Sequence, residues 1–393
     1  MNAVANHQKV SFCLQKIDSY IKQNHQLQWQ KYVQLGSKIV KLVCYSQDFI
    51  PLIEKQLSYA LKDAANSYDA TIILWNEKEI ELFASSIIDD HTKSRLRLQQ
   101  LACKSKDVDF EIVDNADLQR KLLTRISAKN GMVNHFEILD SLYSKHNPII
   151  RSSAVGGIIN AYDQENNIYY YGVKDLHPEE FIKQGHIFVQ IFNKIIKASN
   201  ANLVHAAVVG IDNKGILFCA RGQRGKSTLA VLSMMEGFEY VSDDYLVLER
   251  EGGELYSYPI YSIITLSPKM YNELYDDLNG KFVSNNARKD KYVIDIKNYH
   301  GAFRDKYPIK ICMFPQIVAD AEPSIVSCKK GRAIAQLVYS TINQLEDKHD
   351  IATIKKLISF IKDFDFYQIN LCSDIKKNVD CLKQFCAKIN QNN

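Results

Sequence analysis

Apolar and polar positions alternate along the chain in a way that predicts strands and helices following one another. In the first half, the apolar stretches 38–45, 70–75 and 168–173 favour strands, and a helical pattern beginning near Ile50 separates the first two. The segment 89–146 is charged, and its pattern is mostly helical. This alternation predicts a small α/β module in the N-terminal half of the chain.

The pattern is sharper in the second half of the chain. Leu203–Val209 is apolar throughout and predicts a buried strand, and Ile216–Cys219 predicts another. A helix is expected over Ser227–Glu236, and Gly237 is suited to the position just after its end. Tyr240–Ser242 predicts a third strand. The other predicted elements are strands at 246–249, 255–258, 310–314 and 366–371 and helices at 178–199, 331–345, 351–360 and 373–389.

The loop between the second strand and the helix matches most of the phosphate-binding pattern GxxxxGK[ST]. Its residues are Ala220, Arg221, Gly222, Gln223, Arg224, Gly225, Lys226, Ser227 and Thr228. Alanine stands where the pattern has its first glycine. Gly225 allows a turn that aims N–H groups at phosphate oxygens, Lys226 places a cation against the β- and γ-phosphates, and the Ser227 hydroxyl can bind magnesium. Because the loop follows an apolar strand and opens an apolar helix, the sequence predicts a nucleotide site rather than an ordinary glycine turn.

Two adjacent carboxylates, Asp243 and Asp244, follow the third strand. One can hold the magnesium ion that bridges the phosphates, and the other can accept the proton of an attacking hydroxyl. Next to the loop, we favour this interpretation over an ordinary acidic strand end. His205 leaves two interpretations open. A lone histidine in an apolar strand is usually a core residue, but this one is near enough to the loop to contact the γ-phosphate or Asp243.

Composition narrows the classes of function. The chain has 393 residues, of which 46% are apolar, and a formal net charge of +4. No long basic run points to nucleic acid, and no run of about 18 apolar residues points to a membrane span. The N-terminus lacks the pattern of a secretory signal. The nine cysteines are scattered without CxxC pairing, which indicates reduced thiols and a cytoplasmic protein.

A basic cluster, Arg288, Lys289 and Lys291, lies in a stretch that is expected to be a loop. A solvated loop is the commoner reason for such a cluster. The alternative is a loop that contacts the phosphate acceptor.

Four segments together resemble the catalytic core of the bacterial HPr kinase/phosphorylase family. They are Leu203–Val209, Gly215–Phe218, Gly225–Ala230 and Gly237–Asp244, and the histidine-to-loop and loop-to-aspartate spacings both match. The resemblance implies a fold similar to phosphoenolpyruvate carboxykinase, with ATP and magnesium as cofactors. It implies that Lys226 and Ser227 hold phosphate and magnesium, and that His205 lies in the phosphate region. It also implies that Asp243 is the catalytic base and Asp244 a metal-linked carboxylate.

The chain departs from that family after Asp244, where a glutamate-arginine-glycine signature is replaced by Tyr256-Ser257-Tyr258-Pro259-Ile260-Tyr261. The N-terminal part also differs. In these features the chain is similar to a divergent HPr-kinase-related branch, some of whose members phosphorylate a serine of a ribosomally made peptide, including lasso-peptide precursors.

We therefore expect an α/β protein with a P-loop kinase core over residues 176–393 and an additional N-terminal α/β module over residues 1–175. The expected function is ATP- and magnesium-dependent phosphorylation of a serine or other hydroxyl on a peptide or protein. A small-molecule kinase and a nucleotide-binding regulator with little turnover are the alternatives; an open groove would favour a peptide and a closed cavity a small molecule. No nucleic-acid or membrane partner is expected, and the family tendency to assemble implies a homo-oligomer.

Overall fold

The computed structural model combines strands and helices in both halves of the chain, which confirms the mixed α/β class. It describes residues 15, 17–77, 150–153, 158–163, 165–174, 186–197, 199–220, 224–274, 280–283, 291–296, 302–318, 321–345, 351–362 and 364–391. The segment 89–146 and the basic residues Arg288 and Lys289 lie outside these ranges, so the expectations for them are not addressed. No helix in the described ranges is long and apolar enough to cross a membrane.

The chain divides into two compact units. The first contains residues 1–32, 40–50 and 66–178, and the second contains residues 33–39, 51–65 and 179–393. All residues of the expected nucleotide site belong to the second unit.

A seven-stranded sheet holds the strands of the N-terminal half in the order β3-β1-β2-β4-β7-β6-β5. The strands are β1 (Trp29–Leu35), β2 (Lys38–Cys44), β3 (Leu61–Lys62), β4 (Ala70–Glu77), β5 (Ile150–Ser153), β6 (Ile158–Asp163) and β7 (Ile168–Lys174). The short helix η1 (Gln47–Phe49) and α2 (Ile50–Leu57) follow β2. β2, β4 and β7 run parallel, and β5 and β6 complete the edge in antiparallel fashion. The three strands expected from the apolar pattern are therefore the parallel ones.

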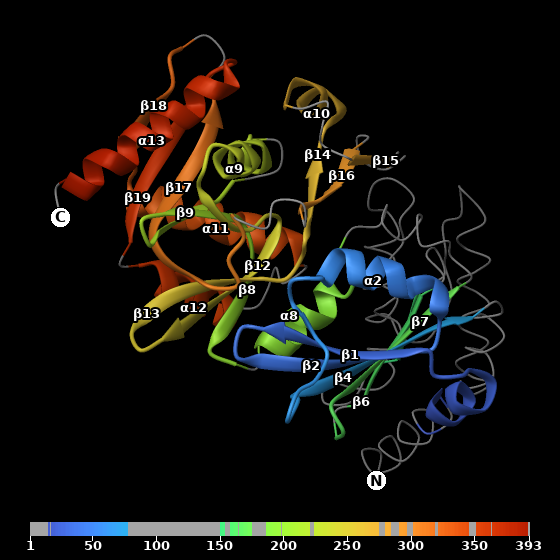
Figure 1. Ribbon diagram of the computed structural model, residues 1–393. Coiled ribbons are helices and arrows are strands. Elements are labelled where there is room, and N and C mark those ends of the chain that lie inside the picture. Colours follow the sequence, from blue (N-terminus) through green and yellow to red (C-terminus); the bar gives the residue numbers. More distant parts are fainter. Residues whose placement is uncertain are drawn as a thin grey trace, which may run out of the picture. The chain divides into compact units, whose positions relative to one another are not determined.

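A nine-stranded sheet is the framework of the second unit (Figure 1). Its path is β11-β9-β10-β17-β13-β12-β8, and β19 pairs with both β17 and β18. The strands are β8 (Ala201–His205), β9 (Ala207–Ile211), β10 (Lys214–Phe218), β11 (Glu239–Ser242), β12 (Tyr245–Glu251), β13 (Glu254–Pro259), β17 (Tyr307–Ile317), β18 (Ser324–Ser327) and β19 (Asp365–Leu371). Because β10, β17 and β19 are parallel, their carboxyl ends meet at one edge, where ligands commonly bind in α/β proteins. A separate three-stranded sheet contains β14 (Ile263–Leu266), β16 (Lys291–Asp295) and β15 (Gly280–Val283).

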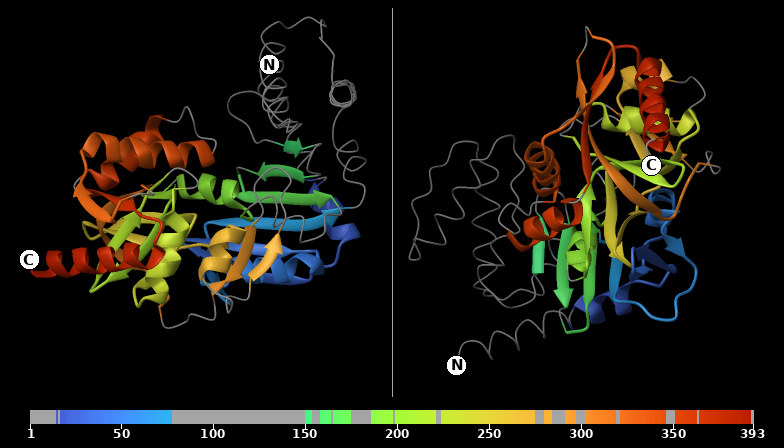
Figure 2. Two further views of the ribbon diagram at one scale, coloured as in Figure 1. Left: turned by 90° about the horizontal axis from the view of Figure 1, so that it is seen from above. Right: turned by 90° about the vertical axis from the view of Figure 1, so that its left-hand side faces the viewer.

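Helices cover both faces of the nine-stranded sheet. They are α8 (Val189–Lys197), α9 (Lys226–Met235), α11 (Lys330–Gln344), α12 (Ile351–Ile361) and α13 (Ile375–Gln391), whereas α10 (Pro268–Leu274) lies against β16 of the three-stranded sheet. Successive strand residues point to opposite faces, so Ile216 and Phe218 pack with α9 and α13, whereas Leu217 packs with α11 and α12. Figure 2 shows α11 and α12 (orange) and α13 (red) on opposite sides of these strands. The core therefore has two layers, with the strands between them.

The sequence-based expectation for residues 203–209 is wrong. The apolar run 203–209 is not a single strand but two, β8 and β9, separated at Ala206. β8 pairs with β12, whereas β9 pairs with β10 and β11, so the chain changes partners at this point. The Ala206 N–H donates instead to the backbone carbonyl of Asp244, at 3.1 Å. His205 is consequently the last residue of a strand and lies beside the Asp243–Asp244 turn.

Candidate functional site

The segment that matches the phosphate-loop pattern connects β10 to α9, as expected. Ala220 is buried two residues after the strand, Arg224 is exposed, and Arg221 to Gln223 lie outside the described ranges. Gly225 immediately precedes α9 with a φ of 89°. A Cβ atom there would lie 2.6 Å from Leu371 Cδ1, so both the left-handed backbone and the neighbouring side chain require glycine.

The first turn of α9 contains the polar part of the motif. Lys226 is its first residue and is buried, while Ser227 and Thr228 are partly exposed. No side chain caps this helix, and no acidic residue lies in its first turn. The backbone N–H groups of the first helical turn and the positive end of the helix dipole therefore favour an anion at this position.

Lys226 joins the loop to the two adjacent carboxylates. Its Nζ lies 3.1 Å from Asp243 Oδ1 and 3.3 Å from Asp244 Oδ1. The exposed fraction of the side chain is 7% for Lys226, 1% for Asp243 and 19% for Asp244. Burial by itself lowers the pKa of Lys226, but the two carboxylates more than offset that effect and raise it. The ammonium group is therefore charged, and one cation is shared between two anions.

Asp244 is enclosed by basic and polar groups on both carboxylate oxygens. His205 Nε2 lies 3.5 Å from Oδ1, on the side of Lys226. On the other side, the Thr265 hydroxyl donates to Oδ2 at 3.4 Å, and His186 Nε2 lies 3.9 Å from the same oxygen. Burial alone raises the pKa of Asp244, but Lys226, followed by the two histidines, holds it well below its usual range. Asp244 is therefore an ionised carboxylate with partners on both sides.

Asp243 is buried with far fewer partners. Apart from the ion pair with Lys226, neither carboxylate oxygen has a hydrogen-bond partner within the described part of the chain. Adjacent residues at a strand end normally point in different directions. Here both carboxylates reach Lys226, because Asp244 has a left-handed φ of 66° that turns the chain back. A buried carboxylate with unfilled acceptor positions is costly, and such groups concentrate where function requires them.

His205 is a buried residue that also lies beside the acidic turn. It is buried at the end of β8, and its Nε2 faces Asp244 rather than Asp243. Burial, followed by the charge of Lys226, lowers the pKa of His205, so the imidazole is neutral near pH 7. Its Nδ1 has no hydrogen-bond partner among the residues that the structure describes.

Sequence reasoning missed two neighbours of Asp244. His186 lies in the stretch that the pattern assigns to a helix over 178–199, whereas α8 begins only at Val189. Thr265 lies in β14, a strand that the pattern did not predict. The spacing of apolar residues along the sequence could not predict these two contacts, because both side chains reach Asp244 through tertiary packing.

The side chains at this site offer the type of ligand atom that magnesium binds. The Ser227 hydroxyl and the carboxylates of Asp243 and Asp244 supply the hard oxygen ligands that magnesium prefers. In the described ranges, no group of three or more His, Cys, Asp or Glu side chains is arranged to hold a metal ion by itself. Magnesium is usually held by one or two carboxylates together with substrate phosphates. The donor set therefore fits an ion that binds together with a nucleotide.

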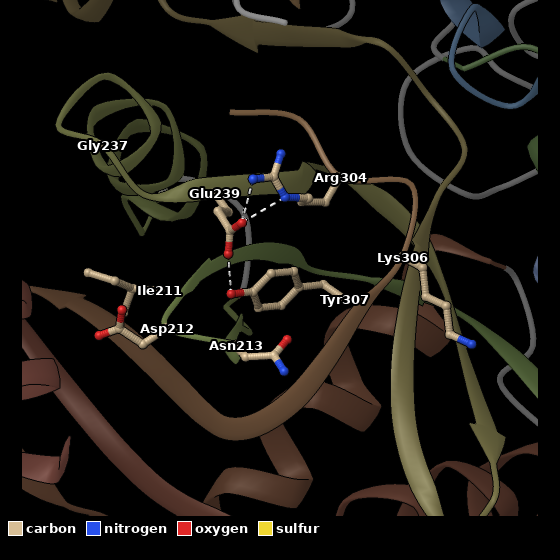
Figure 3. A pocket seen from close by; sticks show the side chains of 8 residues that line it. All are labelled: Ile211, Asp212, Asn213, Gly237, Glu239, Arg304, Lys306 and Tyr307. Atoms are coloured by element: carbon tan, nitrogen blue, oxygen red, sulfur yellow. Dashed lines mark hydrogen bonds and ion pairs between the residues drawn. The ribbon is translucent and has the colours of Figure 1, made fainter. Parts of the chain in front are cut away.

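A cavity of about 500 Å³ lies at the opposite end of β11 (Figure 3). It is lined by Ile211, Asp212, Asn213, Gly237, Glu239, Arg304, Lys306 and Tyr307. Arg304 Nε donates to Glu239 Oε1 at 2.7 Å, and the Tyr307 hydroxyl donates to the other carboxylate oxygen. None of the described residues of the predicted nucleotide site lines this cavity, so it is a separate feature of the sheet.

Comparison with known proteins adds little to this geometry. No family model matches the chain, and no curated protein matches it. Among solved structures, the chain is similar to the Hpr(Ser) kinase/phosphatase from Coxiella burnetii at 12% identity, with 49% of this chain and 94% of that chain covered. The TM-score is 0.27, which is too low to carry a structural argument. The functional interpretation therefore depends on the residues of the site itself.

Proposed function

We propose that the second unit is an ATP- and magnesium-dependent kinase core that phosphorylates a serine or another hydroxyl of a peptide or protein. The observation that carries this proposal is the position of Lys226. Its buried ammonium lies at the uncapped start of α9, within 3.3 Å of two carboxylates that follow a neighbouring strand. The sequence resemblance to HPr-kinase-related proteins supports the same chemistry.

The loop residues 220–228 and Lys226 would hold the nucleotide phosphates. Lys226 Nζ pairs with two carboxylates, and a phosphate group would take the place of one of them as a partner of this ammonium. Ser227 and Asp244 would hold magnesium, which neutralises phosphate charge when it is bound. Transfer then depends mainly on positioning and on charge stabilisation.

Asp243 would act as the catalytic base. The O–H bond of the acceptor breaks, and its proton moves to a carboxylate oxygen of Asp243. The acceptor oxygen forms a bond to the γ-phosphorus, while the bond from that phosphorus to the bridging oxygen breaks and ADP leaves. The buried carboxylate oxygens of Asp243, which lack hydrogen bonds in the described chain, support this role. The neutral His205 would lie in the phosphate region.

The test compares two carboxylate-to-amide changes at the two ends of β11, Asp243→Asn and Glu239→Gln. An amide keeps the shape of the carboxylate but cannot accept the proton. Asp243→Asn should therefore keep Mg-ATP affinity within a few fold, by calorimetric titration, and lower turnover by about 10²–10⁴-fold. Turnover is measured by mass spectrometry on candidate acceptor peptides, starting with those encoded next to the gene. Glu239→Gln is the matched control and should change neither quantity.

Three outcomes would count against this assignment. Turnover that survives in Asp243→Asn would make Asp243 a structural residue. Loss of Mg-ATP binding together with turnover would make Asp243 the principal metal ligand, and its role would be exchanged with that of Asp244. Mg-ATP binding by the unaltered chain without phosphate transfer to any acceptor would indicate a nucleotide-binding regulator.

A further inference from the structure

His186 approaches Asp244 from the side opposite to Lys226 and His205. Its Nε2 lies 3.9 Å from Oδ2, beyond hydrogen-bond distance, whereas the other two side chains approach Oδ1 within 3.5 Å. The imidazole ring is buried beside two tyrosines, with ring centroids 4.3 Å from Tyr261 and 5.1 Å from Tyr245. The ring therefore has little freedom to turn away from the carboxylate.

The backbone that follows His186 is held by side chains from distant parts of the second unit. The Ile187 N–H donates to Gln56 Oε1 at 3.0 Å, and the Ile187 carbonyl accepts a hydrogen bond from the Tyr261 hydroxyl at 2.7 Å. Gln56 and Tyr261 are both buried. Both polar groups of this peptide segment are thus satisfied by side chains rather than by regular secondary structure.

The local conformation is one that the chain does not adopt readily. Phe188 has a φ of 60°, which is an outlier for a bulky residue, and Asp244 has a φ of 66°. Such conformations persist only where the surrounding structure imposes them, and they cluster at functional sites. Both sides of the His186–Asp244 contact therefore depend on a backbone held against its local preference.

We infer that His186 is a positioning residue for Asp244 and that Gln56 and Tyr261 hold His186 in place. The Thr265 hydroxyl donates to Oδ2, and the imidazole of His186 lies beside the same oxygen. The two side chains therefore hold the carboxylate so that its Oδ1 faces Lys226. This inference rests on the proposed function, in which Asp244 binds magnesium together with the nucleotide. Partners that orient a metal-binding carboxylate commonly change metal affinity about 10- to 100-fold when they are removed.

The test measures how strongly magnesium enhances nucleotide binding. The non-hydrolysable analogue AMP-PNP is titrated calorimetrically with magnesium and with EDTA, and the ratio of the two affinities is compared among variants. His186→Ala and His186→Phe should each lower this ratio by about tenfold, because phenylalanine keeps a ring between the tyrosines but has no nitrogen. His186→Gln, which keeps a polar N–H group near Oδ2 but loses the ring, should retain part of the enhancement.

A double-mutant cycle tests the role of the tyrosine. Tyr261→Phe removes only the hydroxyl that holds Ile187 and should produce a smaller loss than His186→Ala. The double variant should be no worse than His186→Ala alone, because Tyr261 acts through His186. Tyr307→Phe removes a comparable buried hydroxyl that bonds to Glu239 and should leave the ratio unchanged. Thermal unfolding confirms that each variant is folded.

The outcomes separate this inference from the proposed function. If the unaltered chain shows no enhancement by magnesium, the proposed function fails and this inference fails with it. If the unaltered chain shows the enhancement but His186→Ala and His186→Phe keep it, His186 is only a packing residue. Additive losses in the double variant would show that Tyr261 does not act through His186.

Discussion

β11 has a carboxylate–cation pair near each end, and the two pairs differ in their contact with water. Beyond its carboxyl end, Asp243 pairs with Lys226, and the exposed fractions of these side chains are 1% and 7%. At its amino end, Glu239 pairs with Arg304, and the exposed fractions are 29% and 42%. Asp243 lies four positions after Glu239 along the chain, so one short segment presents both environments.

The two pairs differ in their contribution to stability and in how completely the carboxylate is hydrogen-bonded. The partly exposed pair is screened by solvent, and such pairs typically contribute about 0–1 kcal/mol. Glu239 has partners for both oxygens, Arg304 for one and Tyr307 for the other. Asp243 has a cation and no hydrogen bond in the described chain, although a buried charge loses its hydration. Both ends of the strand have a carboxylate–cation pair, so charge does not distinguish them. The candidate site is distinguished by a buried carboxylate that lacks hydrogen-bond partners in the described chain.

The largest expected effect comes from removing one cation at each end. Lys226→Met leaves the buried Asp243 and the partly buried Asp244 without their cation and should lower the free energy of unfolding by about 3–5 kcal/mol. Arg304→Met should lower it by about 0–1 kcal/mol, because solvent replaces the guanidinium group. Urea unfolding of the nucleotide-free protein at pH 7 measures both. Equal losses for the two variants would remove the distinction between the two ends of β11.

A second comparison uses the two glycines with left-handed backbone that flank α9. Gly225 and Gly237 lie before and after α9, with φ values of 89° and 94°. Alanine at Gly237 meets nothing within 4 Å and should cost about 1–2 kcal/mol for the left-handed backbone. Alanine at Gly225 should cost the same amount plus about 1 kcal/mol for displacing Leu371.

Nucleotide affinity separates these two glycine variants further. Only Gly225→Ala should weaken Mg-ATP binding, because Gly225 alone belongs to the loop. Calorimetric titration and urea unfolding of both variants provide the check. The loop assignment fails if Gly225→Ala binds the nucleotide as tightly as Gly237→Ala does.

The smallest expected effect is a difference in pH dependence. Because the folded pKa of His205 is lowered, the unfolded chain binds a proton that the folded chain does not, once the pH falls below about 6.5. Stability should therefore fall with decreasing pH in that range, by at most about 1.4 kcal/mol per pH unit for this group. Burial, together with Glu239, raises the pKa of Tyr307, so that residue does not titrate there.

Unfolding measurements between pH 5 and 8 in EDTA give the slopes of stability against pH. His205→Gln should flatten the dependence on the acid side of about pH 6.5. Tyr307→Phe should leave that slope as it is in the unaltered chain. A slope that is the same in His205→Gln would show that His205 does not stay neutral in the folded protein.

The apolar pattern was sufficient for the local part of the site. The sequence predicted a strand at Ile216–Cys219, a loop that contains Gly225 and a helix from Ser227, and the structure has the strand ending at Phe218 and the helix beginning at Lys226. The position of Asp243 directly after a strand follows in the same way. These features depend on neighbours in the sequence, which is why the sequence carries them.

The break at Ala206 was not predictable from the pattern. The run 203–209 is apolar on both sides of Ala206, and such a run looks the same whether or not the chain changes strand partners. Only the pairing of β8 with β12 and of β9 with β10 shows that His205 ends a strand. Conversely, the left-handed φ of Asp244 decides that both carboxylates contact Lys226.

The sequence by itself thus determined that a cation, a hydroxyl and two carboxylates stand at the ends of consecutive elements. Tertiary structure decided which of their atoms meet. The contact of His186 with Asp244 requires Gln56 and Tyr261, which lie 130 and 75 positions away from His186 along the chain. Hydrogen bonds and packing over such separations depend on the folded arrangement of several elements, and no local periodicity encodes them.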